Sequence, residues 1–312
     1  MPDSLSQQSS QYCFIDETAP QDFNCEVLGQ TLCGNGLYLL RLRVVEQAPF
    51  SCLPGQFVML DLPENTYRFR RPFSVLSNPT PNTFELYYKI VGYGTSAMAE
   101  FKTGQKLRCL GPLGNTFQAP DESEHSLFIA GGIGIAPLLF LRAKIQEQNS
   151  SAEAGHCIYG ARSQNELGLQ DKLSAIFSQQ NLHLTTDDGS TGFHGNVVQL
   201  LQSKPELVQK AQKAYICGPS RMMETVCNHL KSVNPNIEIQ VSLESHMPCG
   251  TGACTGCVIP RPAPNLPAKV CFEGPVFNAK DILWHFADEA PCFPTTDFPE
   301  QDKTDEKAAC HD

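Results

Sequence analysis

Residues 127–137 read Leu-Phe-Ile-Ala-Gly-Gly-Ile-Gly-Ile-Ala-Pro, and at this stretch the pattern of the chain changes. Four apolar residues predict a short buried strand, and the glycines that follow mark a sharp turn into a helix. Turns of this kind present free backbone N–H groups that can bind a pyrophosphate. Because Pro137 takes the last position of the G-x-G-x-x-G pattern, the loop alone is a weak signal for nucleotide binding.

Downstream of this turn, strands and helices alternate. An amphipathic helix is expected to run from the turn to about Gln148, and a second helix is expected over residues 164–180. Further strands are predicted at residues 156–159, 182–185, 214–217 and 238–243. This alternation is typical of a parallel sheet with crossover helices, which is the α/β class.

Upstream of the turn, residues 22–117 read as short strands separated by turn residues. Strands are predicted at residues 36–45, 56–62 and 83–91, and few helical stretches separate them. Many short strands of this kind indicate an antiparallel barrel. The expected fold class is therefore β followed by α/β, with the barrel first.

Several fragments could contact a cofactor, although each one alone is more often structural. Arg71-Pro72-Phe73-Ser74 could clamp a diphosphate through its Arg and hydrogen-bond a ring nitrogen through its Ser. Gly92-Tyr93-Gly94-Thr95 could offer backbone N–H groups and a hydroxyl to the same phosphates. Cys217-Gly218-Pro219 could line a nicotinamide pocket or could equally be a sharp turn with a buried Cys. Residues 111–115 are expected to form the turn between the barrel and the α/β unit.

The chain has 14 cysteines, and four of them are clustered. Residues 249–257 read C-G-T-G-A-C-T-G-C, so that Cys249, Cys254, Cys257 and Cys271 follow the C-x4-C-x2-C…C spacing of plant-type [2Fe–2S] ferredoxins. Three glycines within the loop would let backbone N–H groups approach the sulfides. A structural zinc site is the alternative, but zinc sites usually show paired C-x2-C knuckles, and only one is present. The other ten cysteines are expected to be small buried hydrophobes or thiols without a role.

Composition excludes several classes of protein. Among 312 residues, 41% are hydrophobic and 18% are charged, which suits a packed globular core. Most of the net charge of −10 lies in the two ends, so the neutral middle has no basic stripe for nucleic acid or anionic lipid. No run of 18 apolar residues could cross a membrane, and the first ten residues lack the pattern of a signal peptide. We therefore expect a cytoplasmic protein.

Taken in order, the motifs resemble those of the ferredoxin–NADP reductase superfamily. The matching segments are R-P-F-S, Y-Y-K-I-V-G-Y-G-T, G-P-L-G-N, G-G-I-G-I-A-P and C-G-P. The C-terminal C-G-T-G-A-C-T-G-C, followed by K-V-C-F-E-G-P-V-F, is similar to the electron-transfer subunits of B-type dihydroorotate dehydrogenases, as is T-D-D-G-S at residues 186–190. The resemblance spans about residues 22–283.

The resemblance implies five consecutive parts of the chain. Residues 1–21 would be a disordered extension, and residues 285–312 would be an acidic tail. Between them would lie an FAD-binding barrel at residues 22–120, an NAD-binding α/β domain at residues 121–243 and a [2Fe–2S] segment at residues 244–284.

The resemblance also implies a role for each matching position. FAD would be held by Arg71, Pro72, Phe73, Ser74, Tyr87, Tyr88, Lys89, Gly94 and Thr95. The nicotinamide nucleotide would be held by Gly131, Gly132, Gly134 and Cys217. The cluster would be ligated by Cys249, Cys254, Cys257 and Cys271. Phe73 stands where the superfamily often has Tyr. Arg162, after the second α/β strand, leaves NADP open, although a solvated Arg is an equal interpretation.

The implied activity is electron transfer between NAD, FAD and the cluster, and then to or from the FMN of a partner dihydroorotate dehydrogenase subunit in pyrimidine biosynthesis. Hydride transfer needs no general acid or base, so no catalytic residue is expected. One alternative is a reductase subunit of a sulfide dehydrogenase, sulfite reductase or soluble hydrogenase. A redox sensor without turnover and a zinc-stabilised structural protein are the others.

Overall fold

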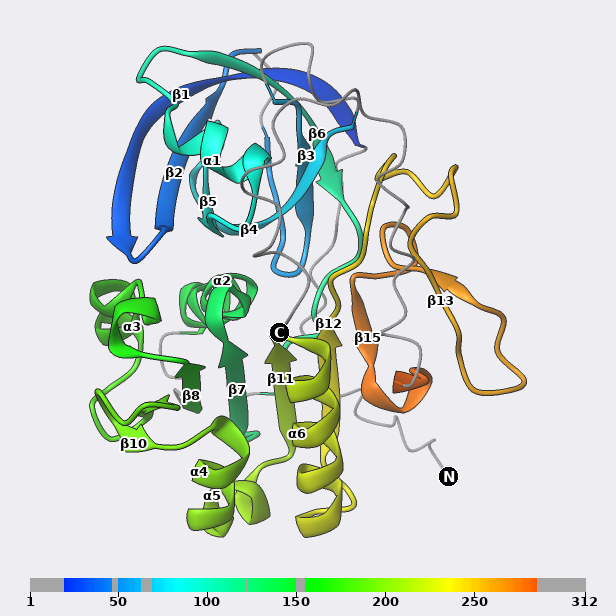
Figure 1. Ribbon diagram of the computed structural model, residues 1–312. Coiled ribbons are helices and arrows are strands. Elements are labelled where there is room, and N and C mark those ends of the chain that lie inside the picture. The colour runs from blue at the N-terminus through cyan, green and yellow to red at the C-terminus, as the bar shows by residue number, and fades with distance from the viewer. Residues whose placement is uncertain (1–19, 47–49, 63–68, 122, 150–154, 285–312) are drawn as a thin grey trace, which may run out of the picture.

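The computed structural model describes residues 20–46, 50–62, 69–121, 123–149 and 155–284. These residues form a closed barrel, a seven-stranded sheet covered by helices and a two-stranded hairpin (Figure 1). The expected β followed by α/β architecture is therefore confirmed. The expected acidic tail and nearly all of the expected N-terminal extension lie outside the described residues, and β1 begins at Gln21. Within the described ranges, no helix is long and apolar enough to cross a membrane.

The barrel has the strand order β1-β2-β5-β4-β3-β6, and all of its neighbouring strands are antiparallel. Its elements are β1 (Gln21–Gly34), β2 (Leu37–Val44), β3 (Phe57–Leu60), β4 (Arg71–Thr80), β5 (Thr83–Lys89), α1 (Tyr93–Ala99) and β6 (Lys106–Leu113). Alternation along β2 buries Leu40 and Leu42 in the barrel core and leaves Arg41 and Arg43 outside. The three strands predicted from the sequence correspond to β2, β3 and β5.

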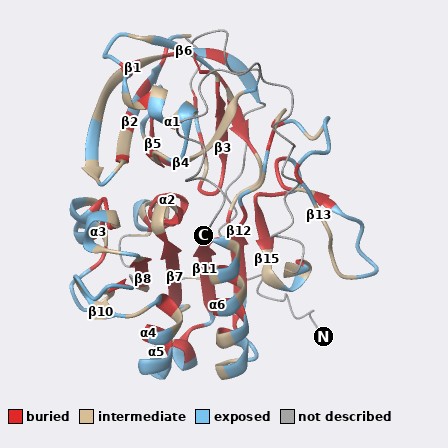
Figure 2. Cartoon of the chain, viewed as in Figure 1, coloured by how far each residue is buried: buried red, intermediate tan, exposed pale blue. Residues whose placement is uncertain are grey.

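The sheet has the order β10-β9-β8-β7-β11-β12-β15 and is parallel except for its last strand, which runs antiparallel to β12. Its strands are β7 (Ser126–Gly131), β8 (His156–Ala161), β9 (Leu182–Thr186), β10 (Phe193–His194), β11 (Lys213–Cys217), β12 (Glu238–Ser242) and β15 (Val276–Asn278). Every residue of β7 and β11 is buried, as Figure 2 shows, because helices cover both faces of the sheet.

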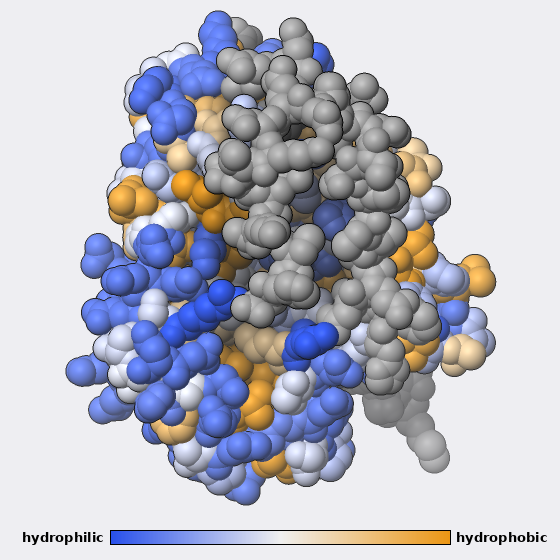
Figure 3. Space-filling model, viewed as in Figure 1, coloured by the Kyte–Doolittle hydropathy of each residue, from blue (hydrophilic) through white to orange (hydrophobic). Residues whose placement is uncertain are grey.

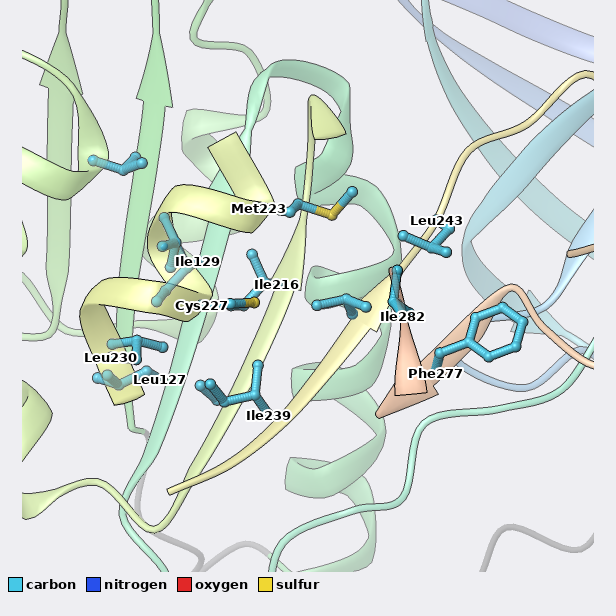
Figure 4. Packing of buried hydrophobic residues seen from close by; sticks show 14 of the residues in the cluster. Leu127, Ile129, Ile216, Met223, Cys227, Leu230, Ile239, Leu243, Phe277 and Ile282 are labelled. Atoms are coloured by element: carbon cyan, nitrogen blue, oxygen red, sulfur yellow. The ribbon is translucent and has the colours of Figure 1, made fainter. Parts of the chain in front are cut away.

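The two faces of β7 pack against different helices. Leu127 and Ile129 belong to the core that contains α6 (Ser220–Val233), α4 (Val197–Ser203) and α5 (Pro205–Lys210), and Figure 4 shows their side chains beside Cys227 and Leu230 of α6. Phe128 and Ala130 point to the opposite face. That face is covered by α2 (Ile135–Gln148) and α3 (Gln170–Ile176).

The helix that follows the glycine-rich turn is not amphipathic, and in this respect the prediction is wrong. The first eight residues of α2, Ile135 to Arg142, are all buried. The reason is tertiary, because α2 lies between the sheet on one side and β4 of the barrel on the other (Figure 1). A helix covered on both sides has no polar face to reveal it by periodicity.

The helix predicted at residues 164–180 is shorter than expected. A 3₁₀ turn, η2 (Gln164–Glu166), comes first, and α3 begins only at Gln170. Between them Leu169 has a left-handed backbone with φ of 61°, which interrupts the helix. Leu167 and Leu169 are buried between the domains. The stabilisation from this packing outweighs the cost of interrupting the helix.

The segment from Gln164 to Lys172 ties the α/β domain to the barrel. Lys89 of β5 lies 3.0 Å from Glu166, and the N–H of Asn35 donates to the carbonyl of Asn165 at 2.8 Å. Glu85, only 1% exposed, accepts from Lys172 at 2.8 Å and also from Arg41 and Ser77. Burial alone would raise the pKa of Glu85, but donation by Lys172 and Ser77 outweighs it and lowers the pKa.

Lys172→Met should destabilise the protein, because it removes one donor from a buried carboxylate. We expect the free energy of unfolding in urea to fall by about 1–3 kcal/mol. Arg43→Met is the matched control, since Arg43 pairs with Glu26 at 2.8 Å on the barrel surface and does not bridge the domains. Such an exposed pair should contribute only about 0–1 kcal/mol. Equal losses in the two variants would contradict the role given to Lys172.

The C-terminal segment is anchored to both domains. It contains the hairpin of β13 (Val258–Ile259) and β14 (Ala268–Lys269), then β15 and the 3₁₀ turn η3 (Ala279–Asp281). Asn115 fixes it to the barrel, since its Nδ2 donates to the carbonyls of Glu273 and Val276 and its Oδ1 accepts from Val276 N–H. Residues 111–115 are thus not simply a turn between domains, because Gly111 to Leu113 belong to β6.

Candidate functional site

A cavity of about 470 Å³ lies where the barrel, the α/β domain and the C-terminal segment meet. Three groups of residues line it. The barrel contributes Phe57, Arg71, Pro72, Phe73, Ser74, Tyr87, Tyr88, Lys89, Val91, Gly92, Tyr93, Gly94 and Thr95. The α/β domain contributes Ile133, Gly134, Ala136, Pro137 and Cys217. The segment after β12 contributes Leu243, Glu244, Ser245 and Met247, and Pro275 completes the wall.

The barrel wall of the cavity is aromatic with few polar groups. Ser74 stands opposite Phe57 on the neighbouring strand, so one hydroxyl faces a largely apolar surface. Phe73 and Tyr88 meet edge to face with ring centroids 6.1 Å apart. The hydroxyl of Tyr88 donates to Gln30 at 2.7 Å, which holds the ring in place. A flat, mostly apolar ring system with a few polar atoms fits such a wall.

The start of α1 forms the outer end of this wall. The N–H groups of Val91 and Gly92 donate to Thr95 Oγ1 at 2.9 and 3.2 Å, so this hydroxyl caps the helix. A Cβ at Gly94 would lie 3.0 Å from Leu62 Cδ1 and 3.8 Å from Arg71 Nε. The absence of a side chain at Gly94 therefore leaves the Arg71 guanidinium close to the helix start.

The nucleotide loop and the Cys217 loop pack tightly against each other. A Cβ at Gly134 would lie 2.4 Å from the carbonyl oxygen of Cys217, and one at Gly131 would lie 2.6 Å from Met222 Sδ. Gly132 instead has open space around it and a φ of +54°. Of the thirteen residues expected to bind FAD or NAD, Gly131 and Gly132 alone are not part of the cavity lining. The packing of the two loops therefore explains why residues 131 and 134 are glycines. The lack of a side chain there would also give a ligand room to approach.

Glu244 is the acidic residue of the cavity lining, and the sequence analysis did not propose it. It follows β12 at the carboxyl edge of the sheet, which is the general position of ligand sites in such sheets. Its side chain is exposed to the cavity, yet protein surrounds the cavity, and this burial raises the pKa of Glu244. The sequence contained a signal for Glu244, because this residue directly follows the strand predicted at residues 238–243. A residue at that end of a strand could have been included in the candidate site.

Glu244→Gln should raise the melting temperature at pH 8 and leave it nearly unchanged at pH 4. An acid whose pKa is raised by folding is uncharged in both states below its ordinary value of 4.5, so there the substitution has little effect. Above the raised pKa, the ionised group destabilises the folded state, and Gln removes that loss. Scanning calorimetry of both proteins at the two pH values measures the difference. An equal shift at both values would contradict this account.

The four clustered thiols are arranged as two pairs. Cys257 and Cys271 are buried, with their sulfurs 3.2 Å apart. Cys254 is exposed and Cys249 is half-buried, and the N–H of Cys254 donates to Cys249 Sγ at 3.4 Å. A two-iron cluster takes two thiolates on each iron, so paired thiols suit it better than they suit a single tetrahedral ion.

Backbone N–H groups converge on these sulfurs. Thr251 donates to Cys249, Gly252 to Cys271, Gly256 to Cys254 and Cys271 to Cys257, at N···S distances between 3.2 and 3.5 Å. Burial would raise the pKa of Cys249, but donation from Cys254 and Thr251 prevails and lowers it to about 6. Burial and the neighbouring Cys257 thiol raise the pKa of Cys271 to about 12. The donor set fits an anionic cluster, whose potential depends on such N–H···S bonds.

The loop reaches this shape through three residues with positive φ. They are Gly250 at 75°, Gly252 at 79° and Thr255 at 58°. Gly256, the third glycine expected to let a backbone N–H approach, has no positive φ. Its N–H donates to Cys254 Sγ, and a Cβ there would lie 3.1 Å from Pro248. A Cβ at Gly250 would lie 2.6 Å from Met59 Cγ of β3, so this glycine also lets the loop pack against the barrel.

Three family models match successive parts of the chain. The oxidoreductase FAD-binding domain matches residues 24–117 and the oxidoreductase NAD-binding domain matches residues 128–228. The iron–sulfur cluster binding domain of dihydroorotate dehydrogenase B matches residues 244–283. These matches cover the barrel, the sheet and the thiol segment described above.

Curated relatives match over most of their length. An electron transfer subunit of dihydroorotate dehydrogenase B (NAD(+)) from Desulforamulus reducens is 32% identical over 272 residues, which are 84% of this chain and 98% of the relative. The chain belongs to this family. The corresponding subunit from Enterococcus faecalis is 34% identical over 241 residues, covering 74% of this chain and 86% of its own. Like the family, the chain is an oxidoreductase subunit with FAD, NAD and iron–sulfur domains.

Solved structures agree with this assignment. A chain from the study titled "Insights into flavin-based electron bifurcation via the NADH-dependent reduced ferredoxin-NADP oxidoreductase structure" aligns with a TM-score of 0.72 and 26% identity, over 88% of this chain and 94% of that one. The ferredoxin reductase of carbazole 1,9a-dioxygenase, at 21% identity and a TM-score of 0.60 over 70% and 68%, shares the fold. This chain therefore has a ferredoxin-reductase-like fold.

Proposed function

We propose that this chain passes electrons between NADH and the FMN of a separate catalytic subunit that oxidises dihydroorotate. One observation supports the path more than any other. Phe57, Leu243 and Met247 line the cavity and share one continuous hydrophobic core with Cys257 and Cys271. Packed apolar side chains thus connect the candidate flavin site to the buried thiol pair.

The residues of the site would act by binding and positioning. Arg71 and the start of α1 would hold the diphosphate of FAD, and Ser74, Tyr87, Tyr88 and Lys89 would surround its ring. Gly134 and Cys217 would place the nicotinamide on the opposite side of the cavity. A bound flavin accepts electron pairs from a nicotinamide and delivers single electrons to an iron–sulfur cluster. The chain would enclose the two cofactors, and no side chain needs to move a proton during hydride transfer.

The partner would dock where the cluster loop reaches the surface. Cys254 is exposed there, and three large apolar residues of the same segment are exposed as well: Val258 at 45%, Leu266 at 80% and Phe272 at 64%. Figure 3 shows apolar side chains gathered on the side of the molecule that carries β13. Apolar surface around an exposed ligand suits a protein partner that receives electrons.

The eleven described cysteines are all free thiols, which fits the reducing cytoplasm.

Affinity purification of the native protein without air tests the proposal. We expect an FMN-containing subunit to co-purify and the complex to reduce NAD when dihydroorotate is added. The isolated chain should bleach with NADH, show a [2Fe–2S] signal in electron paramagnetic resonance and leave dihydroorotate unchanged. A sulfide dehydrogenase, sulfite reductase or hydrogenase subunit in the complex would instead support the alternative partners and overturn this one.

A further inference from the structure

The turn that carries Cys271 is held by a set of hydrogen bonds. The N–H groups of Phe272 and Glu273 both donate to the carbonyl of Lys269, at 3.0 and 2.9 Å. In return, the N–H of Lys269 donates to the carboxylate of Glu273 at 2.7 Å. Asn115 of the barrel donates to the carbonyl of Glu273 at 2.9 Å, which also fixes the turn to the first domain. The backbone of residue 272 is therefore held in one position.

The side chain that this turn presents at the surface is apolar. Phe272 is 64% exposed, and the ammonium of Lys269 lies 5.0 Å from the centroid of its ring. The same ammonium lies 3.6 Å from the carboxylate of Glu273, so the cation is fixed beside the ring. Because most of Phe272 remains in solvent, its packing contributes little to the hydrophobic core. The orientation of the ring therefore needs a different explanation.

The inner side of Phe272 covers the thiol loop. A Cβ built on Gly252 would lie 3.1 Å from Phe272 Cβ, 3.2 Å from its Cγ and 3.5 Å from its Cδ2, so the side chain rests on the Gly252 backbone. Gly252 is the residue whose N–H donates to Cys271 Sγ at 3.2 Å. Its φ of 79° already favours glycine, and the contact with Phe272 is a second reason for the absence of a side chain.

We propose that Phe272 shields the hydrogen bond between Gly252 and Cys271 from water and thereby lowers the reduction potential of the cluster. The inference rests on the proposed function, because it concerns the cluster that would exchange electrons with the partner. A cluster held by four thiolates becomes more negative when it takes up an electron. Water beside its sulfurs stabilises that extra charge and raises the potential. By excluding water from one sulfur, Phe272 makes the reduced cluster a stronger electron donor.

Potentiometry followed by electron paramagnetic resonance tests the shield in the complete chain with its cofactors and without the partner. Phe272→Ala should raise the ratio of reduced to oxidised cluster at a fixed potential by at least about threefold. Phe272→Leu should match the wild type, because leucine keeps the Cβ, Cγ and Cδ atoms that contact Gly252. Leu266→Ala is the control, since it removes an 80% exposed apolar side chain from the loop between β13 and β14. An unchanged ratio in Phe272→Ala, or an equal rise in either other variant, would overturn the proposal.

Pulsed paramagnetic resonance in D₂O measures the access of water to the cluster directly. Phe272→Ala should increase the deuterium modulation of the cluster signal, and Phe272→Leu should leave it unchanged. A shift in potential without this increase would mean that Lys269 has moved toward the cluster, and it would overturn the shield. If these results are as expected but the wild type exchanges no electrons with a dihydroorotate-oxidising subunit, the proposed function fails while the role of Phe272 stands.

Discussion

Cys271→Ala should abolish the iron–sulfur signal and reduce electron transfer to the partner by at least about 100-fold, while NADH still reduces the flavin. Even residues that only support a metal ligand change metal affinity about 10–100-fold, and Cys271 is itself a proposed ligand. Cys271 is 2% exposed and belongs to the same hydrophobic core as Met247 of the cavity wall, so solvent has little access to take its place as a ligand. Paramagnetic resonance, iron analysis and reduction of a flavin-reactive dye by NADH measure the three properties separately.

Cys227→Ala is the matched control for this variant. Cys227 is a buried thiol on α6, its sulfur lies among the residues shown in Figure 4, and it is not one of the four clustered thiols. The same chemical change there should leave the iron content and the resonance signal at the level of the wild type. A full cluster signal in Cys271→Ala, or an equal loss in Cys227→Ala, would refute the assignment of the four thiols.

Gly134→Ala should slow flavin reduction by NADH about 100-fold, because displacement of a reacting group by about 1 Å can cost that much. The backbone at Gly134 has φ of −60°, which alanine adopts freely, so the effect is steric alone. The added Cβ would lie 2.4 Å from the Cys217 carbonyl oxygen and 2.7 Å from Gly218 N, and these backbone atoms cannot rotate away. The two loops that form the nicotinamide side of the cavity must therefore separate.

Stopped-flow absorbance at the flavin band measures this rate, and circular dichroism checks the fold. Gly29→Ala is the control, since Gly29 lies in β1 with nothing within 4 Å of an added Cβ. It should reduce its flavin within about twofold of the wild-type rate. If Gly134→Ala matches that rate, the close contact between the loops does not position the nucleotide.

Local sequence predicted the elements that depend on local patterns. The alternation in β2, the apolar run of β7 and the Cys spacing each reflect constraints within one segment, and the structure has all three. Features that depend on distant contacts were missed or mispredicted. α2 is buried on two sides and therefore has no polar face. The helix predicted at residues 164–180 is interrupted at Leu169, because packing at the domain interface favours the left-handed backbone of this residue.

The residues of the candidate site divide in the same way, into those that belong to short local motifs and those that depend on distant contacts. The Arg71 and Ser74 motif, the glycine-rich loop and the thiols stand out as short motifs, whereas Glu244 is a single polar residue without a pattern. Asn115 was expected only as part of a turn. Glu244 reaches the cavity only because β12 ends there, and Asn115 matters only because the chain returns to it about 160 residues later. No window of sequence contains both partners of such a contact.

The antiparallel strand β15 has a consequence for protein engineering. It pairs with β12 through Gln240, Val241 and Ser242, and it completes the sheet whose other strands come from the preceding domain. Transplanting residues 244–284 onto another reductase as an appended tag would thus leave its last strand without an acceptor, while cutting the parent chain at residue 243 would bare an edge prone to intermolecular pairing. A working chimera has to exchange the terminal strand and its host edge together.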